Sequence, residues 1–231
     1  FLPLFLLSVA VALLIAFASL RYTTKVYSST GTMLITDPKS APSSDKFESI
    51  ISGNRSQNNL QSEIEVLKSR PLMERVVNKL GLQVSYTAKG KIKGLNVYKQ
   101  APFLLHIYEL KNPSGAFSLQ VKFSDKNRFK VNNESVDFTF NQIFKNNAGV
   151  FALIKNGDTD PEPGMEYTVD WKSARNIAAG LVSAIKVQPK TPGTSIISIN
   201  FLATNPQMAA DIVNSLMVQY DSMTVEQNNY S

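Results

Sequence analysis

The chain is organised around residues 184–231, AIKVQPKTPGTSIISINFLATNPQMAADIVNSLMVQYDSMTVEQNNYS. Apolar and polar residues alternate on both sides of Pro192-Gly193, a dipeptide typical of a type II turn. The alternating apolar residues are Ile185, Val187, Ile197, Ile199 and Phe201. This pattern predicts a β-hairpin with one buried face.

A long amphipathic helix is predicted directly after the hairpin. Asn205 suits the N-cap, where its side chain accepts a hydrogen bond from an early backbone N–H, and Pro206 suits the first helical position. Apolar residues then recur at spacings of three and four: Ala209, Ile212, Val213, Leu216, Tyr220 and Met223. No glycine, proline or basic residue follows Pro206, so we expect the helix and the chain to continue beyond Ser231. The candidate residues for structure and assembly are Asn205, Pro206, Ala209, Val213, Leu216 and Tyr220.

The other end of the chain is strongly apolar. Residues 1–20, FLPLFLLSVAVALLIAFASL, carry no charge, and at about 1.5 Å per residue a helix of this length spans roughly the 30 Å hydrocarbon layer of a bilayer. A signal peptide is the alternative, because Ala16-Phe17-Ala18 resembles a cleavage site, but its apolar region is usually only about 7–15 residues long. The sequence therefore predicts a transmembrane helix over 1–20. Because the chain lacks an initiator methionine, we expect residues before Phe1.

Composition narrows the classes of function. A chain of 231 residues can bury a sizeable core in one or two domains. The net charge of +6 is spread along the chain, and the densest basic run, 89–99, holds one aromatic residue, Tyr98. A nucleic-acid site would interleave more aromatics with a larger basic cluster, so a polyanionic surface such as lipid headgroups or an acidic glycan is the better match. The absence of cysteine excludes thiol catalysis and fits an extracytoplasmic protein.

Between the two ends, the residues predict an α+β domain with a β-rich insertion. A strand over Tyr27–Thr36 is followed by a loop at 37–56, with one short helix at Lys46–Ile51. Leu60–Leu80 has helical periodicity and Pro71 divides it, which indicates a helix pair or a kinked helix. Another amphipathic helix is expected over Ala174–Ala184.

The region from Leu82 to Trp171 differs in pattern, because short alternating runs are separated by Asn, Gly and Pro. The predicted strands are Phe103–Leu110, Ala116–Ser124, Phe129–Val131, Val136–Phe140, Val150–Ile154 and Met165–Trp171. We assign 89–165 to a largely antiparallel insertion, and 21–88 and 166–231 to the two parts of the core.

The predicted fold class is therefore α+β: a membrane-anchored extracytoplasmic domain in which a mixed sheet is packed by helices. We expect Tyr27–Thr36, Ala184–Pro189 and Ser195–Ala203 to form that sheet, with Leu60–Leu80 and Ala174–Ala184 on one face. The β-rich insertion and the long C-terminal helix complete the architecture.

Few residues suit catalysis or metal binding. His106 is the only histidine, and alternation places it beside Leu104 and Tyr108 on one strand face, so a structural role is expected. The oxygen-bearing residues Asn156, Asp158, Asp160 and Glu162 resemble part of a calcium loop but lack its full pattern, which favours a simple turn. Trp171 is expected to pack in the core rather than to hold a sugar. No catalytic, cofactor or metal site is predicted.

Two segments carry a resemblance to a known family. One is Leu60–Leu72, LQSEIEVLKSRPL, which continues through Val76-Val77 to Leu80-Gly81-Leu82. The other is Ile197-Ser198-Ile199 followed by Asn205–Leu216, NPQMAADIVNSL, and Tyr220. Together they resemble the chain-length determinant family, the Wzz-like polysaccharide co-polymerases of bacterial inner membranes, whose final helix follows D-P-x-x-A-x-x-x-x-N-x-[LI]-x-x-x-Y. Asn205 stands where the family more often has Asp, and both residues cap helices.

The resemblance implies an inner-membrane protein with two spans and a periplasmic domain. Such proteins assemble into rings and act with a polymerase on a nascent glycan, setting the length of O-antigen, capsule or exopolysaccharide. Some relatives add a cytoplasmic tyrosine kinase after the second span. The present chain contains no G-x-x-x-x-G-K-[ST] loop, so no kinase chemistry is assigned to it, and we expect no enzymatic activity from these residues.

The sequence is also compatible with two other classes of protein, a sensor domain and an enzyme. An extracytoplasmic sensor domain of a membrane receptor would bind a small ligand and would need a signalling module beyond Ser231. A glycan-processing enzyme would need paired carboxylates in a cleft, whereas the acidic residues here fall mostly on predicted loops and helix faces.

Overall fold

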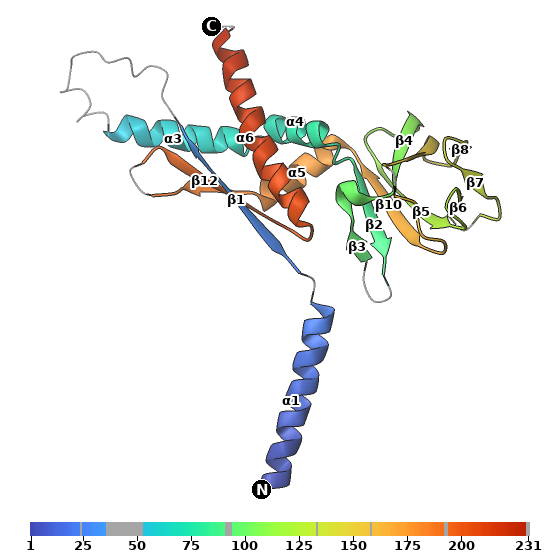
Figure 1. The fold of residues 1–231 in the computed structure, drawn as a ribbon. Coiled ribbons are helices and arrows are strands. Elements are labelled where there is room, and N and C mark those ends of the chain that lie inside the picture. Colours follow the sequence, from blue (N-terminus) through green and yellow to red (C-terminus); the bar gives the residue numbers. More distant parts are fainter. Residues whose placement is uncertain are drawn as a thin grey trace.

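The computed structural model describes residues 1–23, 25–35, 53–90, 94–132, 134–157, 159–191 and 194–229. An isolated N-terminal helix, a sheet covered by helices and a β-rich unit make up these residues (Figure 1). The helix expected at Lys46–Ile51 and the turn expected at Pro192-Gly193 lie outside them.

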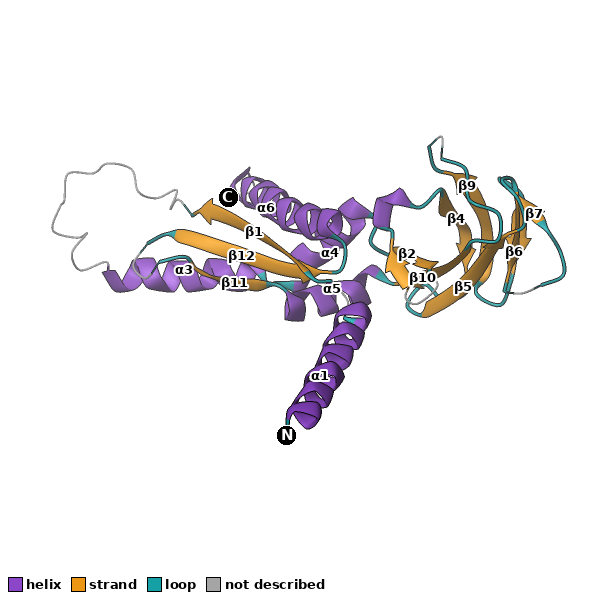
Figure 2. Cartoon of the chain, turned by 60° about the horizontal axis from the view of Figure 1, so that its bottom comes forward, coloured by secondary structure: helices purple, strands orange, loops and turns teal. Residues whose placement is uncertain are grey.

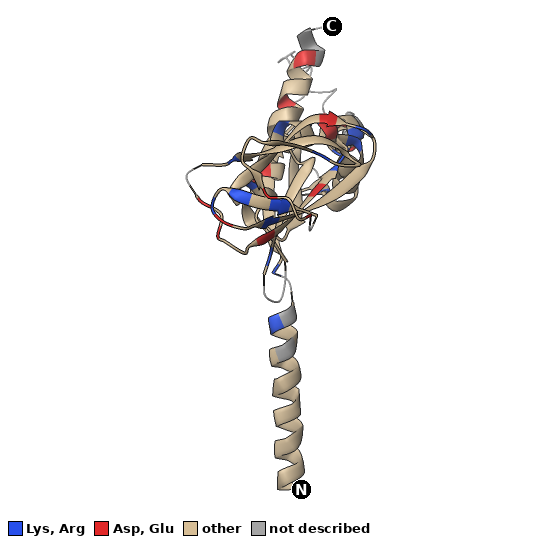
Figure 3. Ribbon diagram, turned by 90° about the vertical axis from the view of Figure 1, so that its right-hand side faces the viewer, with Lys and Arg blue, Asp and Glu red and all other residues tan. Residues whose placement is uncertain are grey.

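Helix α1 (Leu2–Tyr22) stands apart from the rest of the chain (Figure 1). Its described side chains are exposed, and Figure 3 shows no charge along it before Arg21. Over Leu2–Arg21 this helix is long and apolar enough to cross a bilayer, a criterion that N-terminal signal sequences also meet. It extends slightly further than the expected 1–20, and β1 begins soon after it, at Tyr27.

The central sheet consists of β1 (Tyr27–Leu34), β12 (Ile196–Ala203) and β11 (Lys186–Pro189), in the order β1-β12-β11. The prediction that these segments form one sheet is confirmed. The prediction of a mixed sheet is wrong, because both pairs are antiparallel. β11 and β12 are consecutive strands of a hairpin, and β1 runs opposite to β12 along its other edge, so no parallel pair arises.

Helices cover one face of this sheet (Figure 2): α3 (Gly53–Leu67), α4 (Arg70–Leu80), α5 (Ala174–Ala184) and α6 (Pro206–Asn229). The helix pair around Pro71 is confirmed, and Gly81 ends α4 with a φ of 66°, a conformation that glycine adopts readily. α3 begins at Gly53, so the expected loop at 37–56 is wrong for its last residues. A helix held by tertiary packing extends at little cost into a polar segment of this kind.

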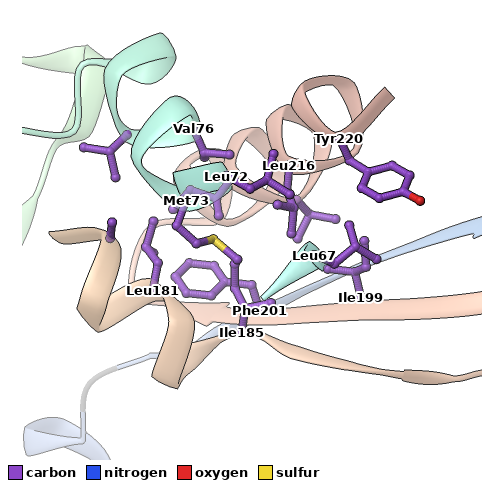
Figure 4. Packing of buried hydrophobic residues seen from close by; sticks show 14 of the residues in the cluster. Leu67, Leu72, Met73, Val76, Leu181, Ile185, Ile199, Phe201, Leu216 and Tyr220 are labelled. Atoms are coloured by element: carbon purple, nitrogen blue, oxygen red, sulfur yellow. The ribbon is translucent and has the colours of Figure 1, made fainter. Parts of the chain in front are cut away.

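The core of this part lies between the helices and the inner face of the sheet. Ile197, Ile199, Phe201 and Ala203 alternate along β12 and are buried, as the hairpin pattern predicts. In Figure 4, Met73 of α4 points toward Phe201, and Leu216 and Tyr220 of α6 lie on the same side of the strands as Met73. On the outer face, the Asn200 amide donates to the hydroxyls of Ser28 (2.8 Å) and Thr30 (2.9 Å).

The β-rich unit contains two further sheets, in which all strand pairs are antiparallel. One has the order β3-β2-β10-β5-β6-β7 and the other β4-β9-β8. The strands are β2 (Val84–Lys89), β3 (Gly94–Asn96), β4 (Phe103–Leu110), β5 (Ala116–Phe123), β6 (Arg128–Val131), β7 (Phe138–Thr139), β8 (Ile143–Lys145), β9 (Gly149–Lys155) and β10 (Glu166–Lys172), with a 3₁₀ turn at Tyr98–Gln100. Because β2 and β10 belong to this unit, it extends beyond the assigned 89–165 at both ends.

Aromatic side chains fill the space between these two sheets. Phe103, Phe123, Phe129 and Phe151 are fully buried, and neighbouring rings contact one another at tilted or edge-on angles. The hydroxyl of Tyr86 on β2 accepts a hydrogen bond from the backbone N–H of Leu105 on β4 (2.8 Å). This core is separate from the core beneath the helices.

Candidate functional site

Asn205 and Pro206 form the start of α6 as the sequence predicts. The side-chain oxygen of Asn205 accepts a hydrogen bond from the backbone N–H of Met208 (3.0 Å), which is the expected N-cap contact. Its amide nitrogen also donates to the backbone carbonyl of Asn96 on β3 (3.1 Å). One nearly buried side chain therefore caps α6 and joins it to the β-rich unit.

The predicted apolar stripe of α6 lies in the core. Ala209, Val213, Leu216 and Tyr220 are all buried against the sheet and the neighbouring helices. Gly31 of β1 lies so close to α6 that a Cβ atom there would be 2.7 Å from Cγ1 of Val213. These four side chains pack within the chain and are not available to another molecule.

Asp211 ties the first part of α6 to the β-rich unit. Its carboxylate accepts hydrogen bonds from the Tyr98 hydroxyl (3.0 Å), the Lys99 ammonium (2.7 Å) and the Gln207 amide (2.9 Å). Partial burial disfavours the charge, but these hydrogen bonds outweigh burial and hold the pKa of Asp211 below its usual value. Tyr98 has a φ of 46°, a conformation that costs a non-glycine residue about 1 kcal/mol or more. The strained residue Tyr98 thus lies at the junction of the two units, where its hydroxyl bonds to Asp211.

Tyr220 connects the middle of α6 to α3. Its hydroxyl donates to the carboxylate of Glu63 at 2.5 Å. Burial raises the pKa of the Tyr220 phenol, and the adjacent Glu63 carboxylate raises it further. The phenol therefore stays protonated and acts as a donor throughout the neutral range.

Near its C-terminal end, α6 forms a solvent-exposed ion pair with α4. The guanidinium of Arg75 on α4 forms two hydrogen bonds with Glu226, at 3.1 and 2.8 Å. Hydrogen bonding from Arg75 lowers the pKa of the Glu226 carboxyl. Contacts at Asp211, Tyr220 and Glu226 thus connect α6 to the rest of the chain at three points, and of these residues only Tyr220 belongs to the predicted apolar stripe.

The opposite face of α6 carries exposed valines. Val218 and Val225 are 57% and 58% exposed, and their spacing of seven places both on one face of the helix. The end of α6 points away from α1 (Figure 1). Among the described residues of α6, these two valines are the large apolar side chains that are exposed.

The residues that were considered for catalysis, metal binding or sugar binding, and given a structural role, make only structural contacts in the described part of the chain. His106 is exposed and its ring contacts Tyr108 with 4.5 Å between centroids, on the face that alternation predicts. Asp160 pairs with Lys155 and Lys126, and the Asn156 amide donates to backbone carbonyls, whereas Asp158 lies outside the described residues. Trp171 is buried and stacks on Phe117. Among the described residues no group of His, Asp and Glu side chains is arranged to hold a metal ion.

Comparison with known proteins gives no family assignment. No family model and no curated protein matches the chain. Two crystal structures of FlgL from Xanthomonas campestris align with 60% and 62% of the chain at 18% and 17% identity, with TM-scores of 0.24 and 0.23. The aligned part spans 40% and 45% of those FlgL chains, and similarity at this level carries no argument about fold or function.

Proposed function

We propose that this chain is part of a polysaccharide co-polymerase of the bacterial inner membrane. In this proposal α1 is a membrane anchor, the remaining domain lies in the periplasm, and copies of the chain assemble into a ring. The ring regulates the length and export of a surface polysaccharide, such as O-antigen, capsule or exopolysaccharide, together with a polymerase and the growing glycan. The chain itself performs no reaction.

The observation that carries this proposal is the arrangement of α6. Its inner stripe is buried, three polar contacts fix it to the rest of the chain, and its outer face bears Val218 and Val225 without a partner among the described residues. We propose that this outer face, where Val218 and Val225 lie seven residues apart, packs against the same helix of neighbouring copies. The resemblance of the α3–α4 and β12–α6 segments to chain-length determinants agrees with this arrangement.

Assembly can be tested without changing the core. We expect Val218→Glu and Val225→Glu to reduce the oligomer of the intact protein in nanodiscs, measured by light scattering, and to shorten or broaden the polysaccharide length distribution in cells. Val136→Glu is the matched control, because Val136 is 56% exposed and lies in the β-rich unit. A monomeric wild-type protein, or normal polysaccharide lengths after loss of the oligomer, would contradict the proposal.

A further inference from the structure

A cavity of about 430 Å³ lies where the helix-covered sheet meets the β-rich unit. Figure 1 shows this junction, with α5 and α6 on one side and β2 and β3 on the other. The volume falls in the range of about 300–1,000 Å³ that is common for small-molecule sites. Because residues from both units line the cavity, a ligand there would contact both of them.

The wall formed by the helices and β12 is apolar. Its side chains are Ile177 and Leu181 of α5, Phe201 of β12, and Met208 and Ile212 of α6. These residues belong to the core beneath the helices, so their positions are fixed by packing. This wall offers a preformed apolar surface but no hydrogen-bonding side chain.

The wall formed by the β-rich unit is largely polar and carries two charged residues, the partly buried Asp170 and the exposed Lys172. Asp170 and Lys172 are two residues apart on β10, so they lie on one face of the strand with their Cα atoms about 7 Å apart. Both residues line the cavity, as does Ser85 on the paired strand β2. No side-chain hydrogen bond or ion pair joins any of these three side chains to another described residue.

This absence of partners contrasts with the charges just outside the cavity. Asp211 accepts hydrogen bonds from three side chains, and Glu166, on the same strand as Asp170, is paired with Lys89 and Lys122. A carboxylate and an ammonium that line one cavity without bonding to each other offer one strong acceptor and one strong donor to a ligand.

We infer that this cavity binds a neutral polyhydroxylated ligand, a saccharide unit. Each hydroxyl of a sugar both donates and accepts, so neighbouring hydroxyls can bond to Asp170 and Lys172 together. The C–H face of the sugar ring would then pack on the apolar wall around Phe201. The natural source of the sugar, a growing glycan, is taken from the proposed function. The chemistry of the site is argued from the residues that line the cavity and does not depend on that proposal.

Binding can be followed with the single tryptophan of the chain. Trp171 lies between Asp170 and Lys172 on β10 and is 6% exposed, so its fluorescence reports changes in this strand rather than direct quenching by solutes. The intact protein in nanodiscs would be titrated with maltose and lactose, and saturation-transfer NMR would detect the bound sugar directly. Glycoside detergents are avoided because they would compete.

Charge-removing variants identify the site. We expect Asp170→Asn and Lys172→Gln each to weaken sugar binding about tenfold or more, because each loses a hydrogen bond to a charged group. Glu109→Gln combined with Lys111→Gln is the matched control, since these two residues have the same spacing and opposite charges and do not line the cavity. The control should bind sugar as the wild type does.

Three results would overturn the inference: no saturable binding of either sugar, equal binding by the wild type and both cavity variants, or preferential binding of sodium octanoate, which would indicate a lipid site. These outcomes are separate from failure of the proposed function. Without sugar binding, ring assembly through α6 and control of polysaccharide length can still hold. If assembly fails while Asp170→Asn loses sugar binding, the cavity site holds and the co-polymerase proposal does not.

Discussion

The side chain of Asn205 has two polar atoms with two separate partners, which allows its roles to be divided by mutation. Asn205→Ala removes both contacts, and loss of the cap alone costs about 1–2 kcal/mol. Asn205→Asp keeps the capping oxygen and places a negative charge at the helix N-terminus, where it is favourable, but it loses the donor to Asn96. We therefore expect the free energy of unfolding, measured with urea, to fall clearly less for Asn205→Asp than for Asn205→Ala. Equal losses would show that the contact with Asn96, where Asp replaces the donor with a second acceptor, outweighs the cap.

Tyr220 predicts a loss of stability in alkali. The pKa of its phenol is raised in the folded state above the unfolded value of about 10. The folded protein thus holds this proton more tightly, so the stabilisation is fully present below pH of about 10 and is lost as the pH rises toward the folded-state pKa.

Tyr220→Phe provides the test of this pH dependence. At neutral pH the free energy of unfolding of the variant should be about 1 kcal/mol lower than that of the wild type, because the hydrogen bond to Glu63 is missing. On going from neutral to alkaline pH, the variant should lose less of its free energy of unfolding than the wild type does. Urea unfolding at neutral pH and above pH of about 10 measures both effects. Parallel stability curves for the two proteins would contradict the assignment of this alkaline loss to Tyr220.

At the scale of elements, Gly31 allows β1 and α6 to approach each other closely. Gly31→Ala would place a methyl group 2.7 Å from Val213 and 3.1 Å from Met217, so we expect it to cost about 1–3 kcal/mol. Val213→Ala removes the nearest atoms, and the double variant should therefore be more stable than the sum of the two single effects predicts. Thermal unfolding of all four proteins gives the coupling, and additive effects would exclude a steric cause.

The elements that could be predicted from the sequence are those with long periodic patterns. β4 has the bounds expected from the alternation in Phe103–Leu110, and α5 those expected from its apolar spacing. β8 was not foreseen because a strand as short as Ile143–Lys145 has too few residues to display a period. The hairpin of β11 and β12 was expected, but the antiparallel pairing of β1 with β12 was missed, since the direction of β1 depends on how two distant segments pair.

The candidate site was predictable only where local chemistry determines it. Asn205 and Pro206 were found because capping depends on neighbours in the sequence. The hydrogen bonds of Asp211 could not be predicted, because Tyr98 and Lys99 are more than a hundred residues away in the sequence. The local pattern around these two residues gives no indication that they contact α6. The contacts of Glu63 and Arg75, and the grouping of charged residues at the cavity, could not be predicted either, because they also depend on segments that are far apart in the sequence.

At the scale of the whole molecule, two separate hydrophobic cores predict two unfolding steps. Phe129 is fully buried in the core of the β-rich unit, and Phe129→Ala should cost about 3–5 kcal/mol there. We expect calorimetry to show a lower transition temperature for this unit and little change in the other transition. Trp171 fluorescence should follow the shifted transition, because β10 belongs to the β-rich unit. A single shifted transition would show that the junction couples both cores completely.

The antiparallel pairing of β1 with β12 has a mechanical consequence. β1 follows α1 after a few residues and pairs with β12 in continuous register from Tyr27 to Leu34. A pull on α1 therefore enters the sheet along the axis of β1, whereas the hydrogen bonds of the ladder run perpendicular to that axis. When the sheet is held at the end where Leu34 pairs with Ile196, such a load shears all the bonds of the strand together rather than opening them one after another. The first strand is thus the element through which a load on the N-terminal helix would reach the folded domain.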